Sequence, residues 1–506
     1  MEALSMLLTG FGEALTPMNI AMAVLGALVG TLVGMLPGLG PTSAIAILLP
    51  LTTVLGPIQG IIMLAGIYYG AMYGGSTTAI LLNIPGEVSS VPTCLDGYPL
   101  AKKGRGGAAL GIAAIASFAA GLLGVVGLVF FAPVLADQAL KFGPPEYFAL
   151  MVLALTVIVN LAGNSIIKGL IMGLLGYLFA MMGMGPSGGQ MRFTFGSDAL
   201  MAGIDMISVI IGLFAIAEVF KGMEENKGTI AIGKISNPYP NASELKQSTG
   251  AIARGGLLGF VLGLLPGCST AVTTFLAYDL ERKVSKTPER FGKGAIEGVA
   301  APEAANNATS SSGFIPLFAL GIPSSPPLAI LLAGLMIYGL QPGPVLFEQN
   351  GGFVWTVIAS MFIGNVMLLV LNLPLVGLWA KLTRVPYGII APIILILSII
   401  GTYTLRNSLF DVLMALIFGV VGYVLNKYRW PVVPFILCFI LGPMMEQSFV
   451  QTLSMSGGSF AIFATRPIAL SIFALALVLL VVSIVLIRRT KKQVKAAVGE
   501  DADIAG

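Results

Sequence analysis

The sequence predicts an all-α polytopic membrane protein built from two inverted-topology repeats, each with broken helices and a hairpin, the two hairpins being opposed. Three observations support this fold class. Hydrophobic residues make up 56% of the 506-residue chain and charged residues 10%, whereas a soluble domain has about 25% charged residues. Several apolar runs reach the roughly 20 residues that a helix needs to cross a bilayer. Pro/Gly motifs interrupt these runs at matching places in both halves, a pattern typical of secondary transporters.

The composition also excludes several kinds of site. The chain has no histidine, so a histidine proton relay and a histidine-ligated metal centre are impossible. Cys94, Cys268 and Cys438 are widely spaced without a CxxC pattern, and we expect them to be free thiols. The net charge of +4 is small and basic residues lie in loops, so nothing indicates nucleic-acid binding. Because the first basic residue is Lys102, we expect no cleavable signal peptide.

Two pairs of motifs define the internal repeat. The stretch Gly34-Met35-Leu36-Pro37-Gly38 recurs as Gly263-Leu264-Leu265-Pro266-Gly267, with 229 positions between Pro37 and Pro266. The stretch Asn83-Ile84-Pro85-Gly86 corresponds to Gly321-Ile322-Pro323-Ser324, with 238 positions between the prolines. Similar separations for two independent motifs indicate that the halves are copies of one unit.

Each apolar run is expected to be a helix, because backbone groups in lipid must be bonded internally and the runs are too long and too little alternated for barrel strands. In the first half we expect a hairpin over 20–56 (arms 20–36 and 42–56), a broken-helix region over 60–106 (span 60–82, polar stretch 83–106), and spans near 107–134, 146–161, 168–183 and 203–220. In the second half we expect a hairpin over 255–280 (arms 255–266 and 267–280), a broken-helix region over 295–337 (295–322 and 326–337), and spans near 353–380, 387–404, 408–425, 430–446 and 467–487. The domains are then a first repeat over 1–220, a cytoplasmic linker over 221–254, a second repeat over 255–487 and a polar tail over 488–506.

The charges of equivalent loops predict that the repeats are inverted. Basic residues collect on the cytoplasmic side of a membrane. The loop after the first hairpin, 52–60, is uncharged, whereas its counterpart, 281–293, is strongly basic. The loop 102–105 after the Ile-Pro turn is basic, whereas its counterpart, 338–352, has no basic residue. The bias therefore changes sides between the halves, and the basic segment 488–492 places the C-terminus in the cytoplasm.

The helix breaks predict a site for an anion. Irregular backbone at mid-membrane depth is tolerated where it is buried in protein or lines a wet cavity, and the helix that follows a break points its N–H groups into that space. The substrate-binding residues we expect are Gly38, Leu39, Gly40, Pro41, Thr42, Ser43, Gly267, Cys268, Ser269, Thr270, Ser76, Asn83 and Ser324. The alternative is that the Pro-Gly segments are tight turns at a membrane face, with the hydroxyl residues as helix caps.

Hydroxyl and amide oxygens close to the breaks predict a cation site. The segments 68–78 and 302–313 are rich in such groups, which suit Na⁺ through their acceptor oxygens. The ion-binding residues we expect are Asn306, Asn307, Glu303, Thr309, Ser310 and Thr77. Two alternatives stay open: Glu303 is a loop residue, and the small residues of these segments allow close helix packing.

The same motifs, taken together, resemble the large membrane subunit (TctA) of tripartite tricarboxylate transporters over almost the whole chain. The residues that carry the resemblance are 34–41, 69–76, 83–86, Asp96-Gly97-Tyr98-Pro99, 265–267, 303–307 and 320–323. The resemblance implies cation-coupled import of carboxylates such as citrate across the bacterial inner membrane. It also implies two partners, a small membrane subunit (TctB-like) and a periplasmic solute-binding protein (TctC-like).

Related transporters imply an elevator-type movement, in which the hairpins belong to the mobile part and helices over 107–220 and 353–487 form the scaffold. The resemblance implies no cofactor other than a coupling ion, Na⁺ or H⁺, and the absence of histidine favours Na⁺. Other readings are a carrier for a dicarboxylate or an aromatic acid, a channel, and a non-transporting scaffold subunit. An intramembrane enzyme is not expected, because the serines 310–312 have no evident lysine partner.

Overall fold

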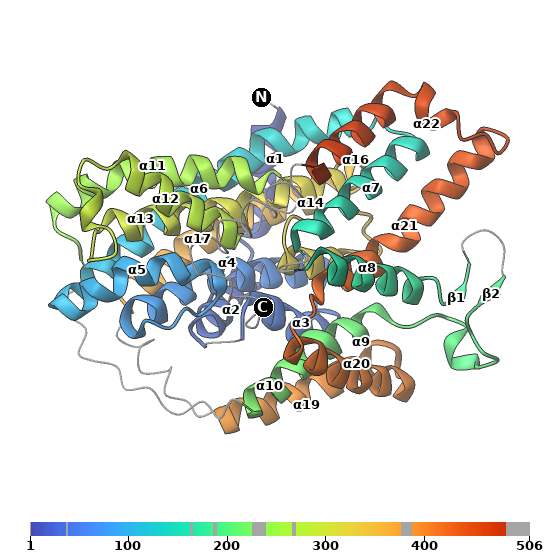
Figure 1. Ribbon diagram of the computed structural model, residues 1–506, viewed down its shortest axis with the longest axis horizontal. Coiled ribbons are helices and arrows are strands. Elements are labelled where there is room, and N and C mark those ends of the chain that lie inside the picture. The colour runs from blue at the N-terminus through green and yellow to red at the C-terminus, as the bar shows by residue number, and fades with distance from the viewer. Residues whose placement is uncertain are drawn as a thin grey trace, which may run out of the picture. The chain divides into compact units, whose positions relative to one another are not determined.

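The computed structural model describes residues 2–36, 39–161, 165–185, 190–224, 239–265, 270–375 and 387–481. Within these ranges the chain is almost entirely helical, apart from one two-stranded sheet (Figure 1). Six of the described helical segments are long and apolar enough to cross a membrane: Pro17–Met35, Val88–Ala139, Met206–Glu224, Gly351–Asn372, Leu409–Lys427 and Val433–Met455. Shorter apolar helices accompany them, as expected where helices are broken.

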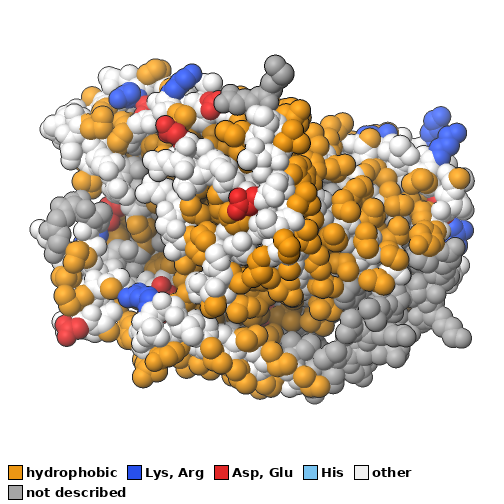
Figure 2. Space-filling model, turned by 180° about the vertical axis from the view of Figure 1, so that it is seen from behind, with side chains coloured by type: hydrophobic (Ala, Val, Ile, Leu, Met, Phe, Trp, Pro, Cys, Tyr) orange, Lys and Arg blue, Asp and Glu red, His pale blue; other side chains and the backbone are white. Residues whose placement is uncertain are grey.

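The chain forms two compact units, and each unit takes a segment from both halves of the sequence. Unit 1 comprises Met1–Leu140 and Ile210–Tyr423, and unit 2 comprises Lys141–Val209 and Val424–Gly506. Figure 2 shows many hydrophobic side chains exposed on one face, as lipid contact requires. Among the described residues, Ile167, Leu174 and Leu409 have exposed fractions of 71%, 70% and 76%.

The first segment of unit 1, Met1–Leu140, contains eight described helical elements, and three of them, α2, α3 and α4, begin at prolines, which are favoured at the first helical position because their missing N–H group is not needed there. The eight elements are α1 (Glu2–Ala14), α2 (Pro17–Met35), α3 (Pro41–Thr52), α4 (Pro57–Leu82), η1 (Val88–Ser90), α5 (Val91–Leu100), η2 (Ala101–Arg105) and α6 (Gly106–Ala139). Helix α4 ends at Asn83, which has the left-handed conformation with φ 58°. Asparagine tolerates this conformation better than most residues, so it closes the helix as a C-cap.

The second segment of unit 1, Ile210–Tyr423, begins at the end of the first half and continues through most of the second. Its elements are η4 (Ile211–Ile216), α10 (Ala217–Glu224), α11 (Ala242–Gly263), α12 (Thr270–Val284), η5 (Pro288–Arg290), α13 (Glu297–Ser312), α14 (Phe314–Leu320), α15 (Pro326–Ile337), α16 (Pro344–Gln349), α17 (Gly351–Asn372), α19 (Tyr387–Arg406) and most of α20 (Leu409–Lys427). Helix α14 ends at Gly321 with φ 71°, at the position that corresponds to Asn83 in the first half.

Unit 2 contains α7 (Pro144–Leu161), α8 (Ile166–Ala180), β1 (Gly183–Met184), β2 (Met191–Arg192), η3 (Asp198–Leu200), α21 (Val433–Met455) and α22 (Ile462–Thr465), with α9 (Met206–Ile210) at its boundary. Helix α21 packs against α7 and α8. Arg192 of β2 forms two hydrogen bonds with the carboxylate of Glu446, at 2.6 and 3.1 Å. This pair ties the antiparallel hairpin β1–β2 to α21.

Glycines four positions apart let α2 approach α4 closely. A methyl group added at Gly26, Gly30 or Gly34 would lie only 2.2–2.5 Å from the carbonyl oxygen of Met63, Ile67 or Ala71, respectively. Small residues at this spacing allow helix backbones to meet inside a membrane. The close packing of α2 on α4 therefore depends on these three positions.

The second half repeats this arrangement at α11 and α13, which lie side by side (Figure 1). A methyl group at Gly255, Gly259 or Gly263 would lie 2.3–2.8 Å from the carbonyl oxygen of Ala301, Ala305 or Thr309, respectively. The glycines lie 229 positions after those of α2, and the carbonyls lie 238 positions after those of α4. These separations equal those of the two proline motifs, so the internal repeat extends from sequence to helix packing.

The structure differs from the sequence-based expectation at several boundaries. Helix α1 was not expected, and α5 lies within the stretch 83–106 that we expected to be a polar connection. Helix α11 begins at Ala242, inside the expected linker 221–254, because Asn241 and Glu244 cap its first turn reciprocally. The expected scaffold range 107–220 is divided between the units, since α6 packs along α13 in unit 1 whereas α7 and α8 belong to unit 2.

Candidate functional site

Glu303 lies at the centre of a buried polar cluster in unit 1. It belongs to α13, whose residues are all buried, and only 1% of its own surface is exposed. Its carboxylate accepts hydrogen bonds from Ser76 Oγ on α4 at 2.6 Å, Thr93 Oγ1 on α5 at 2.5 Å and Ser117 Oγ on α6 at 3.4 Å. Three first-half helices thus surround a carboxyl group from the second half.

No basic side chain pairs with Glu303 in the described part of the chain. A carboxylate removed from water is costly unless hydrogen bonds and a compensating positive charge accompany it. The three hydroxyl groups supply the hydrogen bonds, and a proton on the carboxyl group or a bound cation can neutralise its charge. Intramembrane carboxyl groups of this kind are typical of ion and proton pathways.

A small cavity adjoins this cluster. Its lining residues are Tyr73, Ser76, Thr77, Leu110, Ala113, Ala114, Ser117 and Asn372. The centre of a water-sized sphere has about 10 Å³ in which to move, which corresponds to roughly one water molecule. Ser76 and Ser117 therefore contact both the cavity and the Glu303 carboxylate.

The other residues expected to bind an ion are arranged differently. Asn307 donates from Nδ2 to the carbonyl of Glu303 at 3.1 Å, and Ser310 donates to the carbonyl of Asn307 at 3.0 Å, both within α13. Thr309 donates to the carbonyl of Gly259 at 3.0 Å and so joins α13 to α11. Among the expected ion ligands, Thr77 lines the cavity beside the Glu303 cluster.

Asn306 is an exception among these residues. Only 1% of its surface is exposed, and neither Oδ1 nor Nδ2 forms a hydrogen bond with a described residue, although the amide lies close to the carboxyl of Glu87. An unsatisfied buried amide costs about 1–3 kcal/mol.

The residues expected to bind substrate fall into three groups. Gly38, Gly267, Cys268 and Ser269 lie outside the described residues. Leu39, Gly40, Pro41, Thr42 and Ser43 lead into or begin α3, and Thr270 begins α12, so both breaks are followed directly by helix N-termini. Ser76 belongs to the Glu303 cluster and Ser324 is buried, whereas Asn83 is exposed as the cap of α4 and does not join them.

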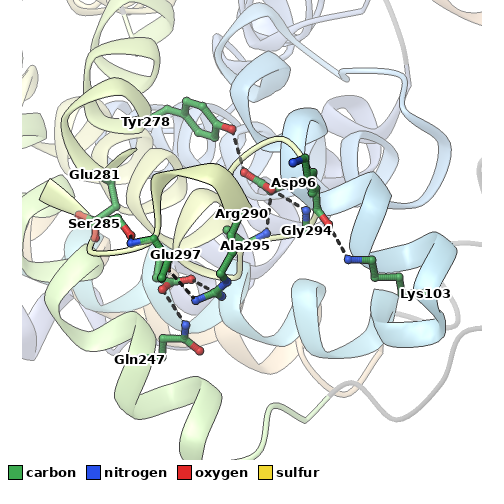
Figure 3. A network of polar contacts seen from close by, with 12 residues as sticks. Asp96, Lys103, Gln247, Tyr278, Glu281, Ser285, Arg290, Gly294, Ala295 and Glu297 are labelled. Carbon is green, nitrogen blue, oxygen red and sulfur yellow. Dashed lines mark hydrogen bonds and ion pairs between the residues drawn. The ribbon is translucent and has the colours of Figure 1, made fainter. Parts of the chain in front are cut away.

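A second polar cluster, shown in Figure 3, was not anticipated from the sequence. Asp96 of α5 is fully buried, and its Oδ1 accepts the backbone N–H groups of Gly294 and Ala295, each at 2.7 Å. Its Oδ2 accepts the hydroxyl of Tyr278 at 2.8 Å. Gly298 is required beside it, because a methyl group there would lie 2.2 Å from Asp96 Oδ2. Asp96 therefore joins α5 of the first half to α12 and the start of α13.

Charged side chains surround this cluster at the ends of the same helices. Glu297 accepts hydrogen bonds from Gln247 at 2.7 Å and from Arg290 at 3.3 Å, and Lys103 donates to the carbonyl of Lys293 at 2.6 Å (Figure 3). Lys293 lies in the connection between α12 and α13, within the segment 281–293 whose basic residues predict a cytoplasmic location. The sequence signal for Asp96 was its position in a short motif, which did not indicate whether the residue was buried.

Other kinds of centre receive no support from the described residues. They contain no group of three or more His, Cys, Asp or Glu residues that could hold a metal ion. Cys94 and Cys438 are free and buried, as expected, and Cys268 lies outside the described residues. The polar groups near Glu303 are hydroxyl and amide groups together with a second carboxyl group, that of Glu87.

The helices and this buried polar centre define a multi-pass membrane protein. The chain belongs to the tripartite tricarboxylate transporter TctA family, whose model matches residues 20–437. It is 44% identical over 502 residues to an uncharacterized 52.8 kDa protein in the TAR-I ttuC' 3' region of Agrobacterium vitis, covering 99% of this chain and all of that protein. It is 41% identical over 234 residues to a protein in the TAR-II ttuC' 3' region of the same organism, covering 46% of this chain and 97% of that protein. No solved structure matches the chain.

Proposed function

We propose that this chain is the large permease subunit of a binding-protein-dependent secondary transporter of the bacterial inner membrane, importing tricarboxylates such as citrate, or related carboxylates, with cation coupling. The observation that carries the proposal is Glu303, a buried carboxylate without a basic partner among the described residues, beside a cavity for one small particle. A positively charged ion that enters with the substrate satisfies this carboxylate. Family membership supports carboxylates as the substrate class and the two other subunits as partners.

Inverted repeats and an elevator-type movement belong to the same proposal. The matched glycine positions on α2 and α11 support a structural repeat, and the loop charges support its inversion. Helix α2 packs against α17, and its counterpart α11 packs against α6. Helices α6 and α17 follow the corresponding Ile-Pro turns of the two halves, so they are equivalent helices. Each half therefore packs its first hairpin helix against the equivalent long helix of the other half, as a pseudo-two-fold relation requires.

The anion binds, in this proposal, where α3 and α12 begin. Each helix directly follows a Pro-Gly break, so its first N–H groups have no partner within the helix and carry the positive end of the helix dipole. The segment 39–43 adds the hydroxyls of Thr42 and Ser43, and the amide of Asn306 is a further donor. Carboxylate oxygens are the ligands that these donors favour.

The alternative is a carrier for another small organic anion, a dicarboxylate or an aromatic acid, or a channel. The test is uptake of radiolabelled citrate, malate, tartrate and benzoate into proteoliposomes containing the chain with its small subunit and binding protein. We expect uptake of at least one di- or tricarboxylate, and accelerated exchange when the same carboxylate is loaded inside. Transport of none of these acids would contradict the proposal, and flux without counterflow would indicate a channel.

A further inference from the structure

The orientation of the groups around the cavity is fixed by their other hydrogen bonds. Ser76 and Ser117 both donate their hydroxyl hydrogens to Glu303 Oε2, at 2.6 and 3.4 Å. A hydroxyl has one hydrogen and two lone pairs. Since the hydrogens point at the carboxylate, both serine oxygens present lone pairs to the cavity that they line.

Tyr73 presents its oxygen in the same way. Asn365 donates from Nδ2 to the carbonyl of Phe118 at 3.0 Å, and a carbonyl can only accept, so the other atom of that amide is the oxygen. The Tyr73 hydroxyl donates to this Asn365 Oδ1 at 2.9 Å. The hydroxyl hydrogen of Tyr73 therefore points away from the cavity, and the lone pairs of its phenolic oxygen face the cavity.

Asn372 supplies a fourth acceptor from the end of α17. Its Nδ2 donates to the carbonyl of Leu368 at 3.0 Å and contacts Thr31 Oγ1 at 3.5 Å. The carbonyl partner again identifies the nitrogen, so Oδ1 remains as the acceptor. Tyr73, Ser76, Ser117 and Asn372 thus line the cavity with oxygens whose associated hydrogens are used elsewhere.

A cavity with these properties disfavours anions and favours a small cation. Its size suits one water-sized particle, and its lining combines acceptor oxygens with the apolar side chains of Leu110, Ala113 and Ala114. The Glu303 carboxylate lies directly behind Ser76 and Ser117, so its negative charge is close to the cavity. Water can also occupy such a space, but water does not neutralise the Glu303 carboxylate, whereas a bound cation does so while the carboxyl group stays ionised. Helices α4, α6 and α17 all contribute lining residues, so an ion bound in the cavity contacts helices from both halves of the sequence.

We propose that this cavity, lined by Tyr73, Ser76, Thr77, Ser117 and Asn372, binds one largely dehydrated Na⁺ ion, and that this ion is the one coupled to transport. The coupling role rests on the proposed carboxylate transport, whereas binding of the ion does not. The site differs from the group expected from the sequence, because Asn307, Thr309 and Ser310 make backbone hydrogen bonds and do not line the cavity. Four of its five side chains belong to the first half, and Asn372 belongs to the second.

The test measures Na⁺ binding by the purified full chain without substrate. The thermal unfolding midpoint is followed while Na⁺ replaces K⁺ at constant ionic strength, because a ligand that binds only the folded state raises the midpoint. The variants are Ser117→Ala, which removes a cavity oxygen, and Ser360→Ala. Ser360 is the matched control, because it is equally buried, at 1% exposure, and donates to the carbonyl of Val357 in its own helix α17.

We expect Na⁺, but not K⁺, to raise the thermal unfolding midpoint of the wild type. In Ser117→Ala the half-saturating Na⁺ concentration should be about tenfold higher, and Ser360→Ala should behave as the wild type does. If Ser117→Ala does not fold, Thr77→Val replaces it with the same expectation. Equal effects of Na⁺ and K⁺, or an unchanged Na⁺ dependence in the cavity variants, would overturn the proposal. Carboxylate uptake by a protein that shows no Na⁺-specific rise would sink this site and leave the transport function standing. Na⁺ binding without uptake of any carboxylate would leave this ion site standing and contradict the proposed transport function.

Discussion

Asn306 shows how a single residue can indicate function through the cost of its burial. Its amide has no hydrogen-bond partner among the described residues and is almost completely buried. Removing an unsatisfied polar group does not remove a stabilising contact, in contrast to most core substitutions. If Asn306 binds the substrate as proposed, its burial costs stability in the isolated chain and is offset when the ligand is bound.

We accordingly expect Asn306→Ala to leave the thermal unfolding midpoint unchanged or higher while carboxylate uptake falls. Thermal unfolding of the purified protein and uptake in proteoliposomes give the two readouts. Asn365→Ala is the contrasting variant, since Asn365 bonds to both Tyr73 and Phe118 and its loss should lower the midpoint. A lower midpoint in Asn306→Ala together with wild-type uptake would assign this residue a purely structural role.

Asp96 acts at the residue scale by satisfying backbone groups. We expect Asp96→Asn to destabilise the protein by about 1–3 kcal/mol, because the neutral amide weakens the bonds to Gly294 and Ala295 and offers no second acceptor to Tyr278. The control is Asp279→Asn, which breaks an exposed pair with Lys283 and should cost less than about 1 kcal/mol. Chemical denaturation of both variants checks the comparison, and equal effects would show that the Asp96 cluster does not stabilise the fold.

At the scale of residues, only part of the polar cluster around Glu303 is predictable from the sequence. Glu303 and Thr77 are predictable, because carboxyl groups are rare in apolar segments and hydroxyl groups gather near the breaks. Thr93, Ser117 and Asn372 are not, because they lie on three separate helices, and only the register in which those helices pack brings them together. Asp96 escapes sequence reasoning for a similar reason, since its partners include backbone N–H groups about 200 positions further along the chain.

At the scale of elements, the glycine positions of α2 and α11 determine how closely the paired helices pack. We expect Gly30→Ala and Gly259→Ala each to destabilise the protein by about 1–3 kcal/mol, because each methyl group would lie 2.5 Å from a carbonyl oxygen of the facing helix. Gly12→Ala in α1 is the matched control, since nothing lies within 4 Å of the added atom. Its effect should be neutral or favourable, because alanine has the higher helix propensity.

Measured midpoints of thermal unfolding decide this comparison. Similar losses in Gly30→Ala and Gly259→Ala would agree with equivalent packing in the two halves, whereas a loss confined to one of them would contradict it. Helix positions themselves are largely predictable, because length and hydropathy set the spans and the prolines set their starts. The glycine spacing is also visible in the sequence. Which carbonyl groups face these glycines, and so why a larger side chain would clash, depends on how the helices pack.

The boundaries that were not predicted have local causes. Helix α5 contains Asp96, Pro92 and Pro99. From the sequence alone this composition is typical of a polar connection, because the buried hydrogen-bond partners of Asp96 are not visible there. Helix α11 starts early because of a capping pair, Asn241 and Glu244, within an otherwise charged segment. In both cases tertiary contacts or caps outweigh average composition.

At the scale of the whole molecule, the proposed inversion of the repeats has a direct consequence for labelling. Val54 and Val284 lie in or beside the loops that follow the two hairpins, and their exposed fractions are 79% and 51%. In a chain without its three native cysteines, we expect Val54→Cys to react with an impermeant maleimide from the periplasmic side and Val284→Cys only from the cytoplasmic side. Reaction of both from the same side would show that the repeats are parallel.

The central claim is that a buried carboxylate couples the entry of a cation to that of a carboxylate substrate. The most direct measurement is uptake of radiolabelled citrate by the chain with its small subunit and binding protein in proteoliposomes, with and without an inward Na⁺ gradient, comparing the wild type with Glu303→Gln. Glu348→Gln, on the exposed end of α16, is the control. We expect accumulation that requires Na⁺ in the wild type and the control and is lost in Glu303→Gln. Gradient-driven accumulation that persists in Glu303→Gln would contradict the account.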